Sequence, residues 1–404
     1  MRLVVVTTYF PNSCDPQRAV FVKNLVTAIE KKCEVTVVSP VPFAPPIGFR
    51  KDWSCLARVE RQEIIDRIEI LHPRYIVIPK LELFSGGSYM LSIVRPLWEL
   101  KQKIGKSMVV HAHCAYPDGV GVAIAAKLLR VPYIISAHGS DINVSVKTRT
   151  LRWQIRWALR NAAAVIGVSS AICKRIAELA DKQLERLVHV PCAGYDPQQF
   201  FPKDRAKARA NIGLAYAGGF VLFVGNLVKI KGVEVLLRAW SRLQKGGKLS
   251  SADRLVIVGD GPLRNSLEKQ AKELCQTGTV IFAGSVPHVA IADWMNAANL
   301  LCLSSFNEGT PNVIVEALAC GVPVISSNVG GIPEVIRDGD NGLMVQPGDE
   351  KSLAEAIRVG LDTDWQEKML VESVAGYTWE NLARRNLDVL NEVVQGRDRV
   401  PLGS

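Results

Sequence analysis

The stretch SFNEGTPNVIVEALACGVPVISS, residues 305–327, combines a turn-rich loop, a short helix and a strand. Thr310 is a favourable helix N-cap and Pro311 a favourable first helical residue, so the apolar run that follows predicts a helix over 311–320. The apolar residues of 299–304, before the loop, predict a strand. The loop and the helix start therefore lie at the carboxyl end of a strand, where open α/β sheets bind their ligands.

The amino end of this helix is a candidate diphosphate site. The amides of residues 312–314 have no partner within a helix that starts here, and the helix dipole adds partial positive charge. Glu316 is the only polar side chain in an apolar turn and a half, and a buried carboxylate needs donors such as the two hydroxyls of a ribose. Glu308 precedes the helix and can reach a sugar beyond the phosphates.

Short β-branched runs alternate with amphipathic segments along the whole chain. The continuously apolar runs indicate strands covered on both faces, and the alternation predicts an α/β fold with doubly wound parallel sheets. The predicted strands lie near residues 2–8, 34–39, 107–112, 132–137, 164–168, 186–190, 220–225, 254–259, 279–283, 299–304, 322–327 and 342–345. The clearest helical segments are 20–31, 150–162 and 262–276.

The alternating pattern occurs twice, with a break at 194–204, which contains two prolines and no periodicity. We therefore expect two Rossmann-like domains, 1–195 and 205–375, that face each other across a ligand-binding cleft. The segment 377–395 predicts one further amphipathic helix.

Composition favours a cytoplasmic globular chain. The 404 residues are 48% hydrophobic, and no apolar run approaches the roughly 18 residues of a membrane span. The first residues resemble a strand more than a secretory signal. Nine scattered cysteines without a C-x-x-C pair argue for a reducing compartment and against a disulfide framework or a structural zinc site.

The net charge of +10 is unevenly distributed. Residues 1–200 hold 27 of the 49 Lys and Arg but only 16 of the 39 Asp and Glu. This excess suggests an anionic partner such as the inner face of a membrane, although charge that only aids solubility explains it equally well. One predicted helix face carries Arg149, Arg152, Arg156 and Arg160 and is bordered by Trp153 and Trp157. This arrangement suits a membrane interface and a solvated helix face equally well. No recognisable nucleic-acid-binding module is present, so we expect no nucleic-acid partner.

Glu308 and Glu316 lie within the pattern EGxPx4EAxAxGxPV, which resembles the signature of the family 4 glycosyltransferases of the GT-B fold. The similarity continues through 330–334 and 340–342 and covers nearly the whole chain, most densely in the second half. The resemblance implies a retaining hexosyltransferase that uses a UDP- or GDP-linked sugar and needs no cofactor or metal. The implied acceptor is a glycan or a lipid-linked glycan of bacterial cell-surface polysaccharide synthesis.

The resemblance also implies roles for individual residues. Glu316 would bind the ribose, Glu308 would hold the transferred sugar, and Lys231 would grip the diphosphate. Family members commonly carry an Arg where this chain has Asn226, so this chain has one cation fewer for the diphosphate. Lys229 is expected to be an exposed lysine rather than a second phosphate ligand. The residues expected to contact the donor are Asn226, Lys231, Gly259, Gly309, Thr310, Pro311, Asn312, Val313 and Glu316.

In the first half, His138 in His-Gly-x-Asp resembles the family histidine that contacts the donor sugar, so His138, Glu308 and Lys231 are the expected catalytic residues. Asp141 and Arg18 are expected on the acceptor side, with Arg18 replacing a glycine pair common in the family. His111 and His113 share a strand face, but two ligands with no Asp or Glu at suitable spacing favour a cleft-lining or core role over a metal site.

Other functions remain open at this stage. A GT-B-like sugar-nucleotide epimerase would need no acceptor, and a catalytically inactive sugar-nucleotide-binding protein would explain Asn226. A dinucleotide oxidoreductase is disfavoured because no G-x-G-x-x-G follows a strand, and no Walker motif supports a nucleotide hydrolase.

Overall fold

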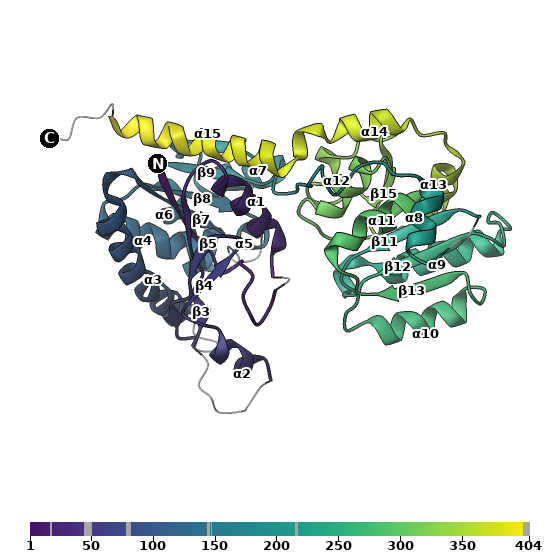
Figure 1. The fold of residues 1–404 in the computed structure, drawn as a ribbon, viewed down its shortest axis with the longest axis horizontal. Coiled ribbons are helices and arrows are strands. Elements are labelled where there is room, and N and C mark those ends of the chain that lie inside the picture. Colours follow the sequence, from purple (N-terminus) through teal and green to yellow (C-terminus); the bar gives the residue numbers. More distant parts are fainter. Residues whose placement is uncertain are drawn as a thin grey trace. The chain divides into compact units, whose positions relative to one another are not determined.

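The computed structural model describes residues 1–16, 18–43, 51–77, 82–143, 146, 148–214 and 217–398. The chain divides into unit 1, Met1–Cys192 with Trp379–Ser404, and unit 2, Ala193–Thr378 (Figure 1). Each unit contains a largely parallel sheet with helices on its faces, which confirms the predicted α/β fold with two Rossmann-like halves. Within the described ranges, no helix is both long and apolar enough to cross a bilayer. In the loop that carries Arg18, the neighbouring Gln17 lies outside the described residues.

The sheet of unit 1 has eight strands among its described residues, in the order β10–β9–β8–β7–β1–β2–β5–β4. All neighbours are parallel except the edge strand β4, which is antiparallel to β5. The strands are β1 Arg2–Val6, β2 Val35–Val38, β4 Gln62–Ile65, β5 Ile68–Leu71, β7 Met108–His113, β8 Tyr133–Ala137, β9 Ala164–Gly167 and β10 Leu187–His189. Two short strands, β3 Val41–Pro42 and β6 Arg74–Tyr75, pair with each other.

Helices cover both faces of this sheet. Apolar residues of α3, α4, α6 and α7 form a core with one face, and those of α1 and α15 form a second core with the other (Figure 1). The helices are α1 Val20–Glu30, α2 Lys51–Arg58, α3 Glu82–Ile104, α4 Val120–Leu129, α5 Ser140–Asn143, α6 Arg149–Arg160, α7 Ser170–Leu179 and α15 Trp379–Asp398, with short helices η1 Gly105–Ser107 and η2 Ala115–Gly119.

In unit 2 the described strands form one parallel sheet in the order β13–β12–β11–β14–β15–β16. They are β11 Phe220–Val224, β12 Arg254–Val258, β13 Val280–Gly284, β14 Leu300–Leu303, β15 Val324–Ser327 and β16 Gly342–Val345. The helices are α8 Arg205–Asn211, α9 Val233–Lys245, α10 Arg264–Leu274, α11 Ile291–Ala297, α12 Asn312–Ala319, α13 Glu350–Asp362 and α14 Glu367–Ser373, with short helices η4 Lys229–Lys231, η5 His288–Ala290, η6 Ile332–Glu334 and η7 Ala375–Tyr377.

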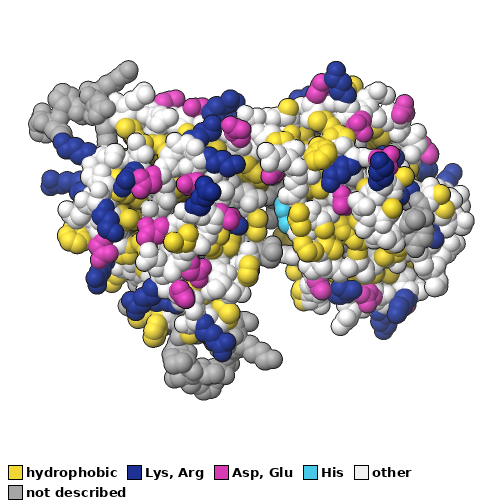
Figure 2. Space-filling view, viewed as in Figure 1, with side chains coloured by type: hydrophobic (Ala, Val, Ile, Leu, Met, Phe, Trp, Pro, Cys, Tyr) yellow, Lys and Arg dark blue, Asp and Glu magenta, His cyan; other side chains and the backbone are white. Residues whose placement is uncertain are grey.

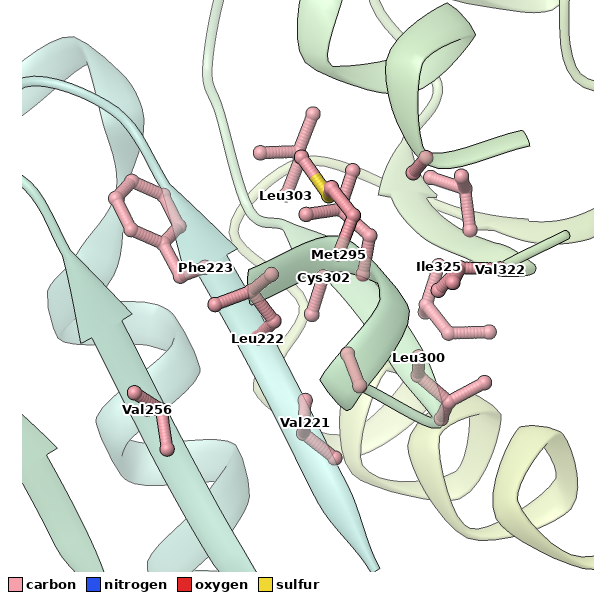
Figure 3. Packing of buried hydrophobic residues seen from close by; sticks show 14 of the residues in the cluster. Val221, Leu222, Phe223, Val256, Met295, Leu300, Cys302, Leu303, Val322 and Ile325 are labelled. Carbon is pink, nitrogen blue, oxygen red and sulfur yellow. The ribbon is translucent and has the colours of Figure 1, made fainter. Parts of the chain in front are cut away.

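The core of unit 2 explains why its strands are apolar along their whole length. Leu222 of β11 is fully buried, as are Met295 of α11, Cys302 of β14 and Ile325 of β15. Figure 3 shows these side chains gathered where α11 covers the sheet. This packing fixes the ends of β11 and β14, from which the site described below extends.

Two features of unit 1 differ from the expectations. The hairpin of β4 and β5 was missed because its two-residue turn, Asp66–Arg67, reaches positive φ of 49° and 71° without the glycine that usually marks such turns. Cys14 and Cys55 form a disulfide, with Cα atoms 5.6 Å apart, which corrects the expectation drawn from the scattered cysteines. Cysteines 41 residues apart give no local sequence signal of pairing.

Candidate functional site

The strand order of unit 2 reverses between β11 and β14, which is the switch point where doubly wound sheets bind ligands. The loops that follow these two strands are joined, since Phe306 N donates a hydrogen bond of 2.8 Å to Ile230 O. Gly232, at φ +62°, permits the approach, because a Cβ there would lie 2.1 Å from Ser304 O. The two motif loops found in the sequence thus form one site.

Lys231 and Glu308 meet across this switch point. Lys231 Nζ lies 2.6 Å from Glu308 Oε1, and Ser305 Oγ donates a hydrogen bond of 2.7 Å to the same oxygen. The side chains are 24% and 9% exposed, so both charges are partly withdrawn from water. The structure therefore brings together two of the three residues predicted to be catalytic.

A glycine turn supports the loop that carries Glu308. Gly330 has φ +60°, and a Cβ there would lie 1.9 Å from Glu308 O. Gly331 N donates a hydrogen bond of 2.8 Å to Gly309 O. This backbone packing positions the Glu308 loop independently of any side-chain contact.

The helix after this loop starts one residue later than predicted. Pro311 is the N-cap of α12, with φ −73° and ψ 131°, and Thr310 makes no capping bond, which corrects both assignments. The Thr310 Oγ1 is buried and has no hydrogen-bond partner among the described residues. The first hydrogen bond at this helix end is donated by Ile314 N to Pro311 O at 3.2 Å. The amides of Asn312 and Val313 come before it and therefore have no acceptor within the helix. The site thus presents two amides and an orphaned hydroxyl.

Glu316 is held by a residue that the sequence did not single out. Glu316 is 2% exposed, and His288 Nε2 lies 3.0 Å from its Oε1. The hydrogen bond to Glu316 raises the pKa of His288 above its usual value, against the opposing effect of burial. Gln199 Nε2 donates to His288 O at 2.8 Å, which fixes the loop. The position of His288 just after β13, at the same sheet edge, was the available signal.

We expect this pair to make the stability of unit 2 depend on pH. The pKa of His288 is higher in the folded protein than in the unfolded chain, where it is about 6.5. The contribution of the His288–Glu316 pair to the free energy of unfolding is therefore complete below about pH 6.5 and is lost as the pH rises through the folded-state pKa. The variant His288→Gln should lack this decline. Denaturant unfolding from mildly acidic to mildly basic pH, followed for both proteins, measures the difference. If the free energy of unfolding varied with pH in the same way for wild type and variant, the stabilising role of the His288–Glu316 pair would be contradicted.

Two of the other residues expected to contact the donor, Asn226 and Gly259, lie on the loops after β11 and β12. Gly259 has φ +139°, and a Cβ there would lie 1.9 Å from Gly225 O, so only glycine allows these loops to touch. Leu227 N donates to Asp260 O at 2.8 Å. Asn226 is exposed beside this contact and carries no charge. Gly309 is exposed at the surface of the same site, whereas the Asn312 side chain accepts a hydrogen bond of 3.3 Å from Gly194 N.

In unit 1, three histidines gather at the carboxyl ends of β7 and β8. The rings of His111 and His113 are 4.1 Å apart, and His113 Nδ1 lies 3.3 Å from His138 Nε2. Burial lowers the pKa of His111 to about 3 and also lowers those of His113 and His138, so the cluster is neutral at pH 7. Among the described residues, no group of three or more His, Cys, Asp or Glu is arranged to hold a metal ion.

Asp141 organises the backbone around His138. The carboxylate is 2% exposed and accepts hydrogen bonds from the amides of Ala115 at 2.6 Å, His138 at 3.2 Å, Gly139 at 2.8 Å and Ile142 at 3.1 Å. Its oxygens are therefore directed at main-chain donors. Asp141 positions the loop that carries His138.

Arg18 and a second buried carboxylate order the loop after β1. Arg18 is exposed, and its Nε donates a hydrogen bond of 2.9 Å to Thr8 O. Asp118 accepts hydrogen bonds from Tyr89 Oη at 2.6 Å and from Thr8 N at 3.1 Å. Burial raises the pKa of Asp118 to about 7. Sequence reasoning did not single out Asp118, because a lone Asp after Tyr-Pro resembles ordinary turn chemistry.

Comparison with known proteins shows the family to which the chain is similar. The family model described as Glycosyltransferase Family 4 matches residues 19–198, and that described as Glycosyl transferases group 1 matches residues 218–362. A Bacillus subtilis protein, TuaC, named as a glycosyltransferase of teichuronic acid biosynthesis, is 30% identical over 363 residues, 88% of each chain.

Solved structures share the fold at low sequence identity. Sucrose-phosphate synthase from Thermosynechococcus elongatus has a TM-score of 0.75 at 20% identity and covers 98% of this chain and 100% of its own. HepE from Anabaena, solved in complex with UDP, has a TM-score of 0.74 at 19% identity and covers 97% of this chain and 100% of its own. Two Rossmann-like halves of this kind define the GT-B class of sugar-transferring enzymes. The chain belongs to the family 4 glycosyltransferases.

Proposed function

We propose that the chain is a retaining glycosyltransferase that moves a hexose-type sugar from a UDP- or GDP-linked donor. The proposed acceptor is a glycan or lipid-linked glycan of cell-envelope polysaccharide biosynthesis. The observation that carries the donor assignment is the Lys231–Glu308 pair at the switch point of unit 2, beside the amino end of α12. The name of TuaC supports the pathway, and the UDP complex of HepE supports the nucleotide.

Different groups of the site suit different parts of the donor. The amides of Asn312 and Val313 and the partial positive charge of the helix end suit the diphosphate. Lys231 supplies a full positive charge beside them, and the unpaired Thr310 hydroxyl can donate to a phosphate or sugar oxygen. Binding would separate Lys231 from Glu308, which frees the carboxylate for the sugar hydroxyls.

Glu316 is proposed to accept the ribose hydroxyls. His288 occupies Oε1 and leaves the second oxygen available for a ligand. A carboxylate accepts hydrogen bonds from two neighbouring hydroxyls, whereas a buried carboxylate without donors would be costly.

Catalysis in this proposal is mainly electrostatic. Breaking the bond from the anomeric carbon to the diphosphate leaves negative charge on the departing phosphate, and Lys231 and the α12 amides are placed to stabilise it. The positive charge comes from the protein, so the proposal requires no metal ion. The roles that the resemblance implies for His138, Asp141 and Arg18 stay predictions.

A thermal-shift panel of UDP-, GDP- and ADP-linked sugars tests the donor assignment, and one nucleotide class should raise the melting temperature. NMR of the product made with that donor then reports the anomeric configuration, for which we expect retention. Conversion of the donor without an acceptor would instead identify an epimerase. Binding without any transfer or hydrolysis would identify an inactive binding protein, the alternative that Asn226 motivates.

A further inference from the structure

We propose that the outer surface of helices α3, α4 and α6 in unit 1 binds an anionic lipid membrane. The three helices pack beside one another against one face of the sheet, and α4 contacts both of the others (Figure 1). Their inner positions, such as Leu97 and Ile155, are fully buried. We call the opposite, solvent-facing surface the α3–α4–α6 face.

Large apolar side chains are exposed on this face. Leu91 and Trp98 of α3 are 70% and 51% exposed, Leu128 of α4 is 66% exposed, and Trp153 of α6 is 68% exposed. Leu91 and Trp98 are seven residues apart and therefore lie on the same side of α3. Tryptophan is favoured where an apolar layer meets water, as at the surface of a bilayer.

Two contacts between helices show that these side chains belong to one surface. Lys101 Nζ of α3 donates a hydrogen bond of 2.5 Å to Leu129 O, which places the turn of Trp98 beside that of Leu128. Lys127 Nζ of α4 lies 5.9 Å from the ring of Trp157 in α6. Packed helices are about 8–10 Å apart, so the exposed apolar residues lie on three neighbouring helices of one surface.

The charge of this face matches an anionic partner. Residues 82–160, which span the three helices, contain 11 Lys and Arg but only four Asp and Glu, and two of the acids, Asp118 and Asp141, are buried. Of the other two, Glu82 and Glu99, Glu99 pairs with Arg95 at 2.9 Å. Figure 2 shows basic, acidic and apolar side chains interspersed on the part of unit 1 that faces the viewer.

On α6 the basic residues flank the exposed tryptophan. Arg149, Arg156 and Arg160 lie four before, three after and seven after Trp153, which places them on one stripe of the helix. Arg156 and Arg160 also pair with Asp181, at 2.8 Å for Arg160, which leaves a net positive stripe. Basic side chains attract anionic headgroups and neighbouring tryptophans insert between them, so the two effects act together.

Vesicle flotation with the full-length protein tests the proposal. We expect binding to vesicles with about 30% phosphatidylglycerol at low salt, and weak binding to pure phosphatidylcholine, because binding needs surface charge. The double variant Trp98→Ser/Trp153→Ser should lower the partition coefficient about tenfold or more, through the loss of inserted aromatic area. Arg149→Glu/Arg152→Glu should lower it similarly and remove much of its salt dependence.

Matched variants control for general changes of surface character. Ile64→Ser/Met369→Ser removes two equally exposed apolar side chains elsewhere, and Lys245→Glu/Lys272→Glu makes the same charge change in unit 2. Both controls should bind vesicles like the wild type. The proposal would be overturned if the wild type did not bind anionic vesicles, or if the tryptophan variant, with an unchanged circular dichroism spectrum, bound them as well as the wild type.

Discussion

Replacing Lys231 by alanine is expected to lower kcat for sugar transfer by about 10²–10³, the usual cost of one lost donor to a developing charge. The Lys231 ammonium lies 2.6 Å from Glu308, in the loop that leads into the amino end of α12, where the leaving diphosphate would gain charge in the proposed reaction. The KM for the donor should change less than kcat, because the interaction strengthens as the bond breaks. Steady-state kinetics with the donor chosen by the thermal-shift panel measures both quantities.

Lys229 provides a matched control two residues away. Lys229 is exposed on the same short helix, η4, so Lys229→Ala removes an equal charge without touching the Glu308 pair. We expect Lys229→Ala to retain most of the activity. A Lys231→Ala enzyme that kept more than about a tenth of the wild-type kcat would argue against a direct role in stabilising the leaving group.

The second large effect concerns the folding of unit 1. Asp141→Ala would leave the amides of Ala115, His138 and Gly139 without a partner in a buried loop, whereas Ile142 N also donates to Gly139 O. A buried donor without a partner costs about 1–3 kcal/mol, and the local backbone can relax in part. We therefore expect a loss of about 3–5 kcal/mol in the free energy of unfolding, measured by denaturant titration.

Two further variants separate the structural role of Asp141 from a chemical one. Asp141→Asn keeps one carbonyl oxygen and should recover part of the lost stability. Glu34→Ala removes an exposed carboxylate that pairs with Arg2 in the same unit and should cost little. If Asp141→Ala unfolded at the wild-type denaturant concentration yet lost activity, the carboxylate would act on the substrate rather than on the loop.

The sequence was most informative where one physical signal dominates. Apart from β4 and β5, the strands of both sheets were predicted within a few residues, because runs such as Val221–Phe223 are buried on both faces and are continuously apolar. Lys231 and Glu308 were identified by their motifs. They are 77 residues apart in sequence but meet in the structure because they follow β11 and β14, which are neighbours in the sheet.

The features that were missed depend on contacts distant in sequence or on backbone geometry. His288 is 28 residues from Glu316 and carries no motif, so only the folded sheet edge brings the two together. Thr310 has the residue type of an N-cap, but the structure buries its hydroxyl in the site and begins the helix after Pro311. Tertiary placement thus overrode a local preference at the functional loop, as is expected at a binding site.

The central claim is that the nucleotide lies at the amino end of α12 with its ribose on Glu316. Isothermal titration calorimetry of the nucleoside diphosphate with wild type and Glu316→Gln tests it most directly, with Glu273→Gln on α10 as an exposed control. Loss of a charged acceptor costs about 1.5–3 kcal/mol, so we predict that Glu316→Gln weakens affinity by about 10- to 100-fold and that the control binds normally. Equal affinity for wild type and Glu316→Gln would contradict the account.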